Sequence, residues 1–206
     1  MYYSGGRVKI LLTGFEPWAE WSSNPSGAGA ESLDGSSIGG CEVVSAVLPV
    51  VHGADIDRVA PLIAEHEPVA VVCLGLHGSA SALHVERVGI NLKVIDGVDY
   101  PIVEGGPDAY FATVPTRAMV ERMEDAGVPA RLTYSAGTFL CNHIMYSVLH
   151  LVAEDDLPAG FIHVPPTPEL VTKLGRSQPS MALETIRTGV VAGVTAVAEN
   201  IKVRRV

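Results

Sequence analysis

The stretch Val69-Ala70-Val71-Val72-Cys73-Leu74 decides how this chain folds. A continuous apolar run of this length is typical of a strand that is buried on both faces. Such strands belong to parallel sheets that helices cover on both sides, because only there does neither face of the strand meet water. We therefore expect a mainly parallel sheet between two layers of helices.

Strand-like and helix-like segments alternate on both sides of this run. Apolar periodicity predicts helices over residues 26–33, 54–66, 116–126, 138–152 and 180–200. Strands are predicted over residues 8–13, 41–50, 69–74, 87–95, 130–134 and 160–164, and an irregular tract over 98–107. This alternation predicts a single-domain α/β fold with a mainly parallel, twisted sheet and helices on both faces, a three-layer α/β/α arrangement.

Composition narrows the class of protein. The 206 residues are 48% hydrophobic and 18% charged, and no linker-like stretch divides them, which favours one domain with a large core. The net charge of −9, without a basic stripe, argues against nucleic-acid binding. No apolar run approaches the roughly 18 residues that cross a bilayer. Three cysteines make no disulfide framework, and residues 1–7 lack the apolar core of a signal peptide, so we expect a cytoplasmic protein.

Cys141 is the best candidate nucleophile. It lies in Ser135-Ala136-Gly137-Thr138-Phe139-Leu140-Cys141-Asn142-His143, after a predicted strand and at the start of a predicted helix. The positive end of the helix dipole favours the thiolate, which is the form that attacks carbonyls. A free cysteine is more often a small buried hydrophobe, and Cys41 and Cys73 are interpreted in that way.

A base and a carboxylate lie in comparable places. Active sites of open α/β sheets gather beyond the carboxyl ends of the strands, where Cys141, His163 and Glu86 are all expected. A thiol, an imidazole and a carboxylate are the parts of a cysteine-hydrolase triad. His143 is a rival base, but residues i and i+2 point to different faces of a helix, so it is not expected to reach the thiol. The alternative for Glu86 is a solvated pair with Arg87.

A metal site is another alternative. Cys73, His77, His84 and Glu86 lie close together in the sequence, but their spacing matches no common zinc pattern. We therefore expect neither a metal nor a cofactor.

Four blocks of the sequence carry a family resemblance. They are Leu11-Leu12-Thr13-Gly14-Phe15-Glu16-Pro17-Trp18 followed by Asn24-Pro25, then Glu86-Arg87-Val88-Gly89-Ile90-Asn91, then the stretch around Cys141, and Gly160-Phe161-Ile162-His163-Val164-Pro165. In this order they resemble the pyrrolidone-carboxylate peptidases, also called pyroglutamyl peptidases I, a family of cysteine peptidases. The resemblance spans nearly the whole chain and implies a phosphorylase/hydrolase-like fold with residues 1–206 as one peptidase domain.

The resemblance also implies roles for single residues. Cys141 would be the nucleophile, His163 its general base and acid, and Glu86 the carboxylate that orients the imidazole. Binding of the pyroglutamyl ring would fall to Phe15, Trp18, Phe139 and Leu140. The implied activity is that of an omega-type exopeptidase that cuts peptides after an N-terminal pyroglutamate, needs no cofactor and forms dimers or tetramers.

The chain departs from the family pattern in two places. Family members usually carry Gly-Gly where this chain has Ala19-Glu20, and an arginine near the position of Asp96. The second change predicts a weaker enzyme if Asp96 faces the site, and no effect if Asp96-Gly97 forms a surface turn. Two other functions therefore stay open, an amidohydrolase of the same mechanism acting on another cyclic or acylated amino group, and a ligand-binding homologue without catalysis.

Overall fold

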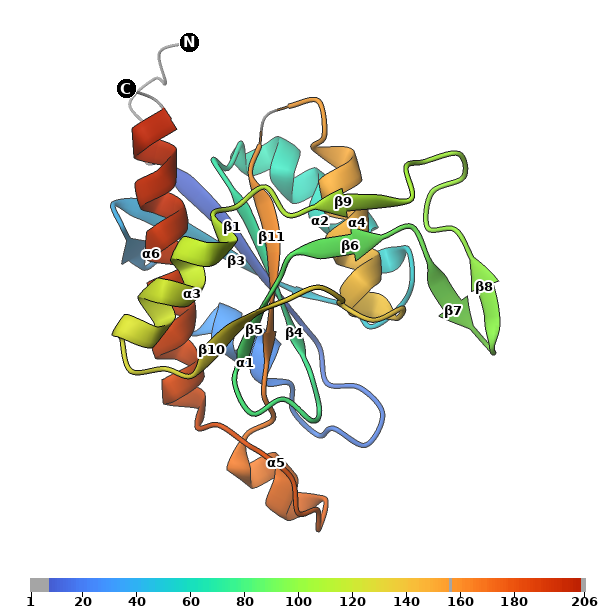
Figure 1. Ribbon diagram of the computed structural model, residues 1–206, viewed down its shortest axis with the longest axis vertical. Helices are drawn as coiled ribbons and strands as arrows, with labels where there is room; N and C mark the ends of the chain where they lie inside the picture. Colours follow the sequence, from blue (N-terminus) through green and yellow to red (C-terminus); the bar gives the residue numbers. More distant parts are fainter. Residues whose placement is uncertain (1–7, 156, 205–206) are drawn as a thin grey trace.

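A seven-stranded sheet forms the centre of the computed structural model, which describes residues 8–155 and 157–204 (Figure 1). Its strands, in spatial order, are β10 (Ala130–Thr133), β5 (Leu83–Glu86), β11 (Ala159–Val164), β4 (Val71–Leu76), β1 (Lys9–Phe15), β3 (Cys41–Leu48) and β2 (Ser37–Ile38). Residues 1–7, in which the sequence shows no apolar core typical of a signal peptide, lie outside the described residues.

The middle of the sheet is parallel, as the apolar run predicted. β4 pairs in parallel with β1 on one side and with β11 on the other, and β1 pairs in parallel with β3. The strand begins at Val71, two residues later than expected, and is buried from Val71 to Gly75. Its side chains therefore alternate between two covered faces, which is why the sequence shows no polar position.

Helices cover both faces of the sheet, which confirms the predicted fold class (Figure 1). One face packs against α2 (Ala54–His66) and α4 (Leu140–Leu151), and the other against α1 (Pro25–Glu31), α3 (Thr116–Asp125) and α6 (Leu183–Arg204). α2 has the predicted bounds, whereas α6 begins and ends later than expected, and the short helix α5 (Pro168–Lys173) was not predicted.

The predicted strand over residues 87–95 is wrong. The sheet strand is β5, which ends at Glu86, and the chain then leaves the sheet. β6 (Val88–Ile90) pairs with β9 (Ala109–Phe111), and β7 (Lys93–Ile95) forms a hairpin with β8 (Val98–Tyr100) inside the tract expected to be irregular. At Gly89 a Cβ atom would lie 3.2 Å from the backbone of α4, so the chain there follows the helix and not the sheet.

The hairpin of β7 and β8 projects from the body of the molecule (Figure 1). Its turn is Asp96-Gly97, and both residues have positive φ, 51° and 76°, as a two-residue hairpin turn requires. Asp96 is exposed there. This is the surface turn that the sequence offered as one explanation of the departure at Asp96.

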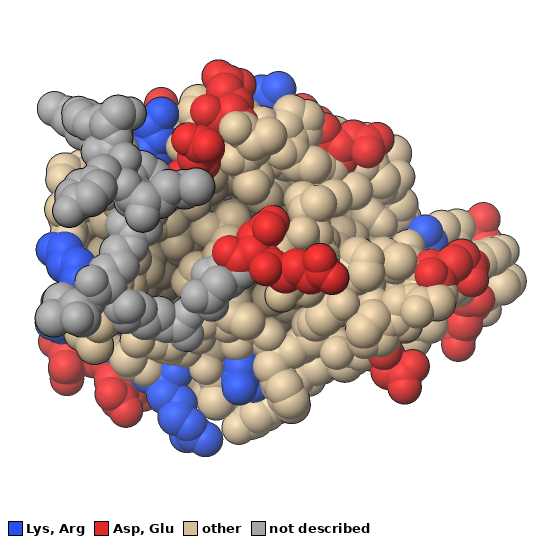
Figure 2. Space-filling model, turned by 90° about the horizontal axis from the view of Figure 1, so that it is seen from above, with Lys and Arg blue, Asp and Glu red and all other residues tan. Residues whose placement is uncertain are grey.

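Charges are scattered over the face seen in Figure 2, where acidic residues form several small, separate patches and the basic residues do not join into a stripe. None of the described helices is both long enough and apolar enough to cross a membrane.

Candidate active site

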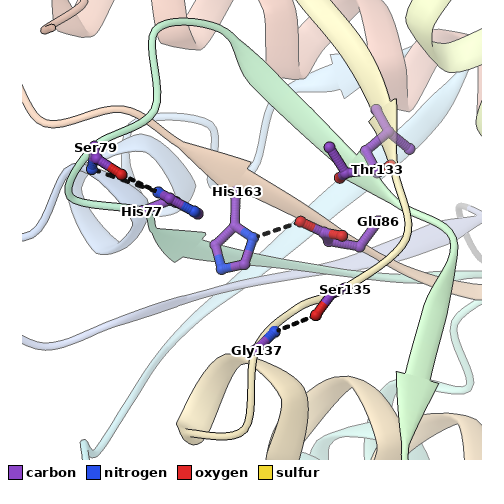
Figure 3. A network of polar contacts seen from close by, with 8 residues as sticks. His77, Ser79, Glu86, Thr133, Ser135, Gly137 and His163 are labelled. Atoms are coloured by element: carbon purple, nitrogen blue, oxygen red, sulfur yellow. Dashed lines mark hydrogen bonds and ion pairs between the residues drawn. The ribbon is translucent and has the colours of Figure 1, made fainter.

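His163 and Glu86 meet on the face of the sheet that α4 covers. Phe161 of β11 pairs with Glu86 of β5, so His163 and Glu86 are diagonal neighbours on adjacent strands. Glu86 is 1% exposed, and its Oε1 lies 2.8 Å from His163 Nδ1 (Figure 3).

The contact corrects one sequence-based expectation and removes one alternative. β5 and β11 are antiparallel, so Glu86 reaches the site across the sheet and not from a shared carboxyl edge. The surface pair of Glu86 with Arg87 does not form either. The Arg87 guanidinium lies 4.7 Å from the centre of the Phe111 ring and donates to the Ala112 carbonyl.

Cys141 lies in the first turn of α4, directly above β4. The glycine at position 75, which pairs with His163 across the sheet, makes room for the thiol. A Cβ atom there would lie 2.8 Å from the Cys141 sulfur and 2.6 Å from the Phe161 ring. A close approach of this kind is available to glycine alone, because every other residue carries a Cβ.

The electrostatics of His163 link the three side chains. Burial alone would lower its pKa, but the charge and hydrogen bond of Cys141 and the hydrogen bond of Glu86 outweigh burial and raise the pKa of His163 to about 9. Because Nδ1 of His163 bonds to Glu86, Nε2 is the ring nitrogen that remains to interact with Cys141. At neutral pH the ring is therefore an imidazolium that holds one proton toward each partner.

His143, the rival base, belongs to a different cluster. Its Nδ1 lies 2.8 Å from Oδ2 of Asp55, which is fully buried at the start of α2. The ring of His52 packs edge-on against His143 at 5.0 Å and against Phe139 at 5.2 Å. His143 thus faces away from Cys141, as its spacing on the helix predicted.

The other cysteines are packing residues, as expected. Cys41 and Cys73 both belong to the hydrophobic core. Burial raises the pKa of the Cys73 thiol to about 12, so this thiol stays protonated.

A pocket of about 180 Å³ adjoins the thiol. It brings together the four residues predicted to bind a ring, namely Phe15, Trp18, Phe139 and Leu140, with Cys141. Trp18 and Phe139 are about half exposed, and their ring centres are 5.1 Å apart at the mouth of the pocket.

Sequence reasoning missed part of the lining. The additional lining residues are Trp21, Asn24, Val50, Leu76 and Gly78. Asn24 was within a family block, but its side chain is already used, since Oδ1 accepts from the Ser26 N–H and Nδ2 donates to the Glu16 carbonyl. None of the described residues that line the pocket is acidic or basic in type.

The loop after Trp18 shows how the chain accommodates its first departure from the family pattern. Ala19 has φ of 52°, a left-handed conformation that glycine adopts at lower cost. The next residue, Glu20, lies 2.8 Å from Arg176, whose guanidinium is 5.5 Å from the centre of the Trp21 ring. The segment after α5 therefore holds this side of the pocket rim.

Two histidines that the sequence offered only as a weak metal set lie next to the imidazole. The His77 ring is 5.2 Å from the His163 ring and 5.2 Å from the His84 ring. Burial first, and then the charge of Arg131, lower the pKa of His84 to about 4, so His84 is neutral at pH 7.

Comparison with known proteins gives one consistent result. The family described as pyroglutamyl peptidase matches residues 8–200. A pyrrolidone-carboxylate peptidase of Cupriavidus necator is 41% identical over 95% of both chains, and that of Coprothermobacter proteolyticus is 40% identical over 94% of this chain and 99% of the relative. The solved structure of the pyrrolidone carboxyl peptidase from Thermococcus litoralis superposes with a TM-score of 0.90 at 37% identity, covering 95% of each chain. The pyroglutamyl peptidase I of Bacillus amyloliquefaciens gives 0.88 at 32% identity, covering 93% of this chain and 97% of that one.

Proposed function

Because this chain belongs to the pyroglutamyl peptidase family, we propose that it is a cysteine peptidase that removes an N-terminal pyroglutamyl residue from peptides. Cys141 is the nucleophile, His163 the general acid and base, and Glu86 the residue that orients the imidazole. The observation that carries the proposal is the 2.8 Å contact of His163 with Glu86, together with the electrostatic influence of Cys141 on His163, beside a pocket that no charged residue lines.

The pocket supports a lactam as the group that is recognised. A pyroglutamyl ring is flat and uncharged, and it fits between aromatic walls such as Phe15, Trp18 and Phe139. A free N-terminal amino group is positively charged, and the pocket has no carboxylate to pair with it. Removing this charge from water would therefore cost free energy that no contact in the pocket offsets. This arrangement favours the cyclised N-terminus.

Acylation follows from the imidazolium and the thiolate. The Cys141 sulfur attacks the carbonyl carbon that joins pyroglutamate to the next residue, and the carbonyl π-electrons move to oxygen. The N–H groups in the first turn of α4 have no partner inside the helix, and Phe139 supplies no side-chain cap, so they are available to the oxyanion. When the carbon–nitrogen bond breaks, His163 gives its Nε2 proton to the leaving amine.

Deacylation reverses these roles. His163, now neutral, takes a proton from a water molecule whose oxygen attacks the thioester carbon. The carbon–sulfur bond then breaks, free pyroglutamate leaves, and the thiolate and the imidazolium are restored. Glu86 keeps the ring in place through both steps because its bond to Nδ1 does not change.

The broader amidohydrolase loses its main support. It depended on a remodelled tract around Asp96, but that residue lies in the turn of an exposed hairpin and is not among the residues that line the pocket. A binding homologue would have no use for a thiol in contact with a buried imidazolium.

Hydrolysis of three matched amides tests the proposal. We expect rapid cleavage of a pyroglutamyl amide, and much slower cleavage of the prolyl amide, which lacks the ring carbonyl, and of the glutamyl amide, which is charged. Cys141→Ala should abolish cleavage, whereas Cys73→Ala, which removes a thiol from the hydrophobic core, should retain it. Equal turnover of the prolyl and pyroglutamyl amides would favour the amidohydrolase, and an inactive but folded wild-type protein would favour the binding homologue.

A cytoplasmic location and a dimeric or tetrameric state belong to the same proposal. They rest on the sequence and on the family resemblance, and light scattering of the purified protein would measure the second.

A further inference from the structure

His77 follows β4 directly and lies next to the proposed catalytic pair. Along the chain, Leu76 and Gly78 line the pocket, whereas the intervening His77 is not among the lining residues and lies beside His163. There its ring stands at 90° to that of His163 (Figure 3). The proposed chemistry leaves His77 without a role.

Burial around His163 indicates where the leaving peptide passes. The His163 ring interacts with the side chains of Cys141, Glu86, Phe161 and His77, and the buried His84 lies opposite it on β5. Glu86 and Phe161 are buried, and Cys141 carries the acyl group. The amine that receives the His163 proton therefore has one partly exposed neighbour left among these side chains, which is His77.

His77 offers a hydrogen-bond donor at this place. Its Nδ1 lies 3.4 Å from the backbone nitrogen of Ser79, which donates to it, so the ring proton of neutral His77 is on Nε2. Burial, followed by the charge of His163, lowers the pKa of His77 and favours the neutral ring at pH 7. No other described residue is recorded as a hydrogen-bond partner of Nε2.

We propose that His77 binds the leaving part of the substrate, by donating its Nε2–H to the main-chain carbonyl of the residue that follows pyroglutamate. The inference rests on the proposed function and adds to it a preference for peptides over simple amides. The pyroglutamyl pocket selects the first residue, and His77 recognises the backbone of the second.

Two substrates that differ in this carbonyl test the idea. Pyroglutamyl-alanine amide carries it, whereas pyroglutamyl isopropylamide replaces the whole carboxamide with a methyl group. We expect His77→Ala to lower the ratio of kcat/KM for the first substrate to kcat/KM for the second by roughly three- to tenfold, the value of one neutral hydrogen bond. His77→Gln, which restores an N–H donor, should recover most of this ratio.

A matched control is His66→Ala, at the last residue of α2, which should leave the ratio as in the wild type. An equal loss on both substrates would overturn the proposal, because His77 would then act through His163. An unchanged ratio in His77→Ala would overturn it as well. Failure of the proposed function is distinct, since the wild-type protein would then cleave neither substrate.

Discussion

Gly75 and Cys141 approach each other so closely that no side chain fits between them, since a Cβ atom at position 75 would lie 2.8 Å from the Cys141 sulfur. The same atom would meet the Phe161 ring at 2.6 Å, and Phe161 is fully buried. The thiol therefore depends on a glycine of the neighbouring strand for its position over the sheet.

Gly75→Ala is expected to lower kcat by at least about tenfold, because displacing a reacting atom by about 1 Å is sufficient for losses of this size. Steady-state kinetics on a pyroglutamyl amide measures this. Gly29→Ala in α1 is the matched control, since its Cβ would meet only Leu74 Cδ1 at 3.9 Å, an ordinary contact. Wild-type kcat in folded Gly75→Ala would contradict the proposed position of the thiol.

The pH profile should report the raised pKa of His163. Protonation of the leaving amine needs the imidazolium, so kcat/KM should persist to about pH 9 and fall above it, where His163 loses its proton. Glu86→Gln removes a partner that raises this pKa, so its basic limb should move to lower pH. Measuring both profiles on one pyroglutamyl amide tests the assignment. A basic limb that does not move in Glu86→Gln would show that His163 is not the acid.

Ala19→Gly should stabilise the protein by about 1 kcal/mol. Ala19 has φ of 52°. In this left-handed region of backbone conformation, a residue with a Cβ atom is about 1 kcal/mol less stable than glycine. Urea unfolding gives the difference in the free energy of unfolding. Ala28→Gly inside α1 is the same substitution in a helical backbone, and it should destabilise by about 1 kcal/mol. Similar losses in both variants would mean that Ala19 is unstrained.

Asp96→Arg should leave kcat/KM within about twofold of the wild type. The arginine that family members carry near this position is replaced here by an exposed hairpin turn, where a charge is screened by water. Kinetics on a pyroglutamyl amide at low ionic strength is the most sensitive measurement. A clear gain in kcat/KM would place this position at the site and restore the expectation of a weakened enzyme.

Much of the fold could be predicted from the sequence because periodicity is a local signal. The bounds of α2 (Ala54–His66) were predicted to the residue, and β4 was displaced by two. The segment after Glu86 was not predictable in this way, since its strands pair outside the main sheet, β6 with the distant β9 and β7 with β8 in a local hairpin. Apolar content alone does not say which sheet a strand joins.

The candidate site, too, could be predicted only in part from the sequence. The family blocks name the side chains of the thiol, the imidazole and the carboxylate, which the structure brings together. They do not reveal that Glu86 reaches His163 across an antiparallel pair, because strand direction depends on the topology. His77 belongs to no block, and its place beside His163 follows only from the register of β4 and β11.

The most direct test of the central claim is mass spectrometry of the protein quenched in acid during turnover of a pyroglutamyl amide. A covalent mechanism at Cys141 predicts a pyroglutamyl group, bound as a thioester, on the peptide that contains this residue. The same group should be absent from Cys141→Ala protein treated in parallel. Hydrolysis that proceeds with the group on another residue, or undiminished in Cys141→Ala, would contradict the account.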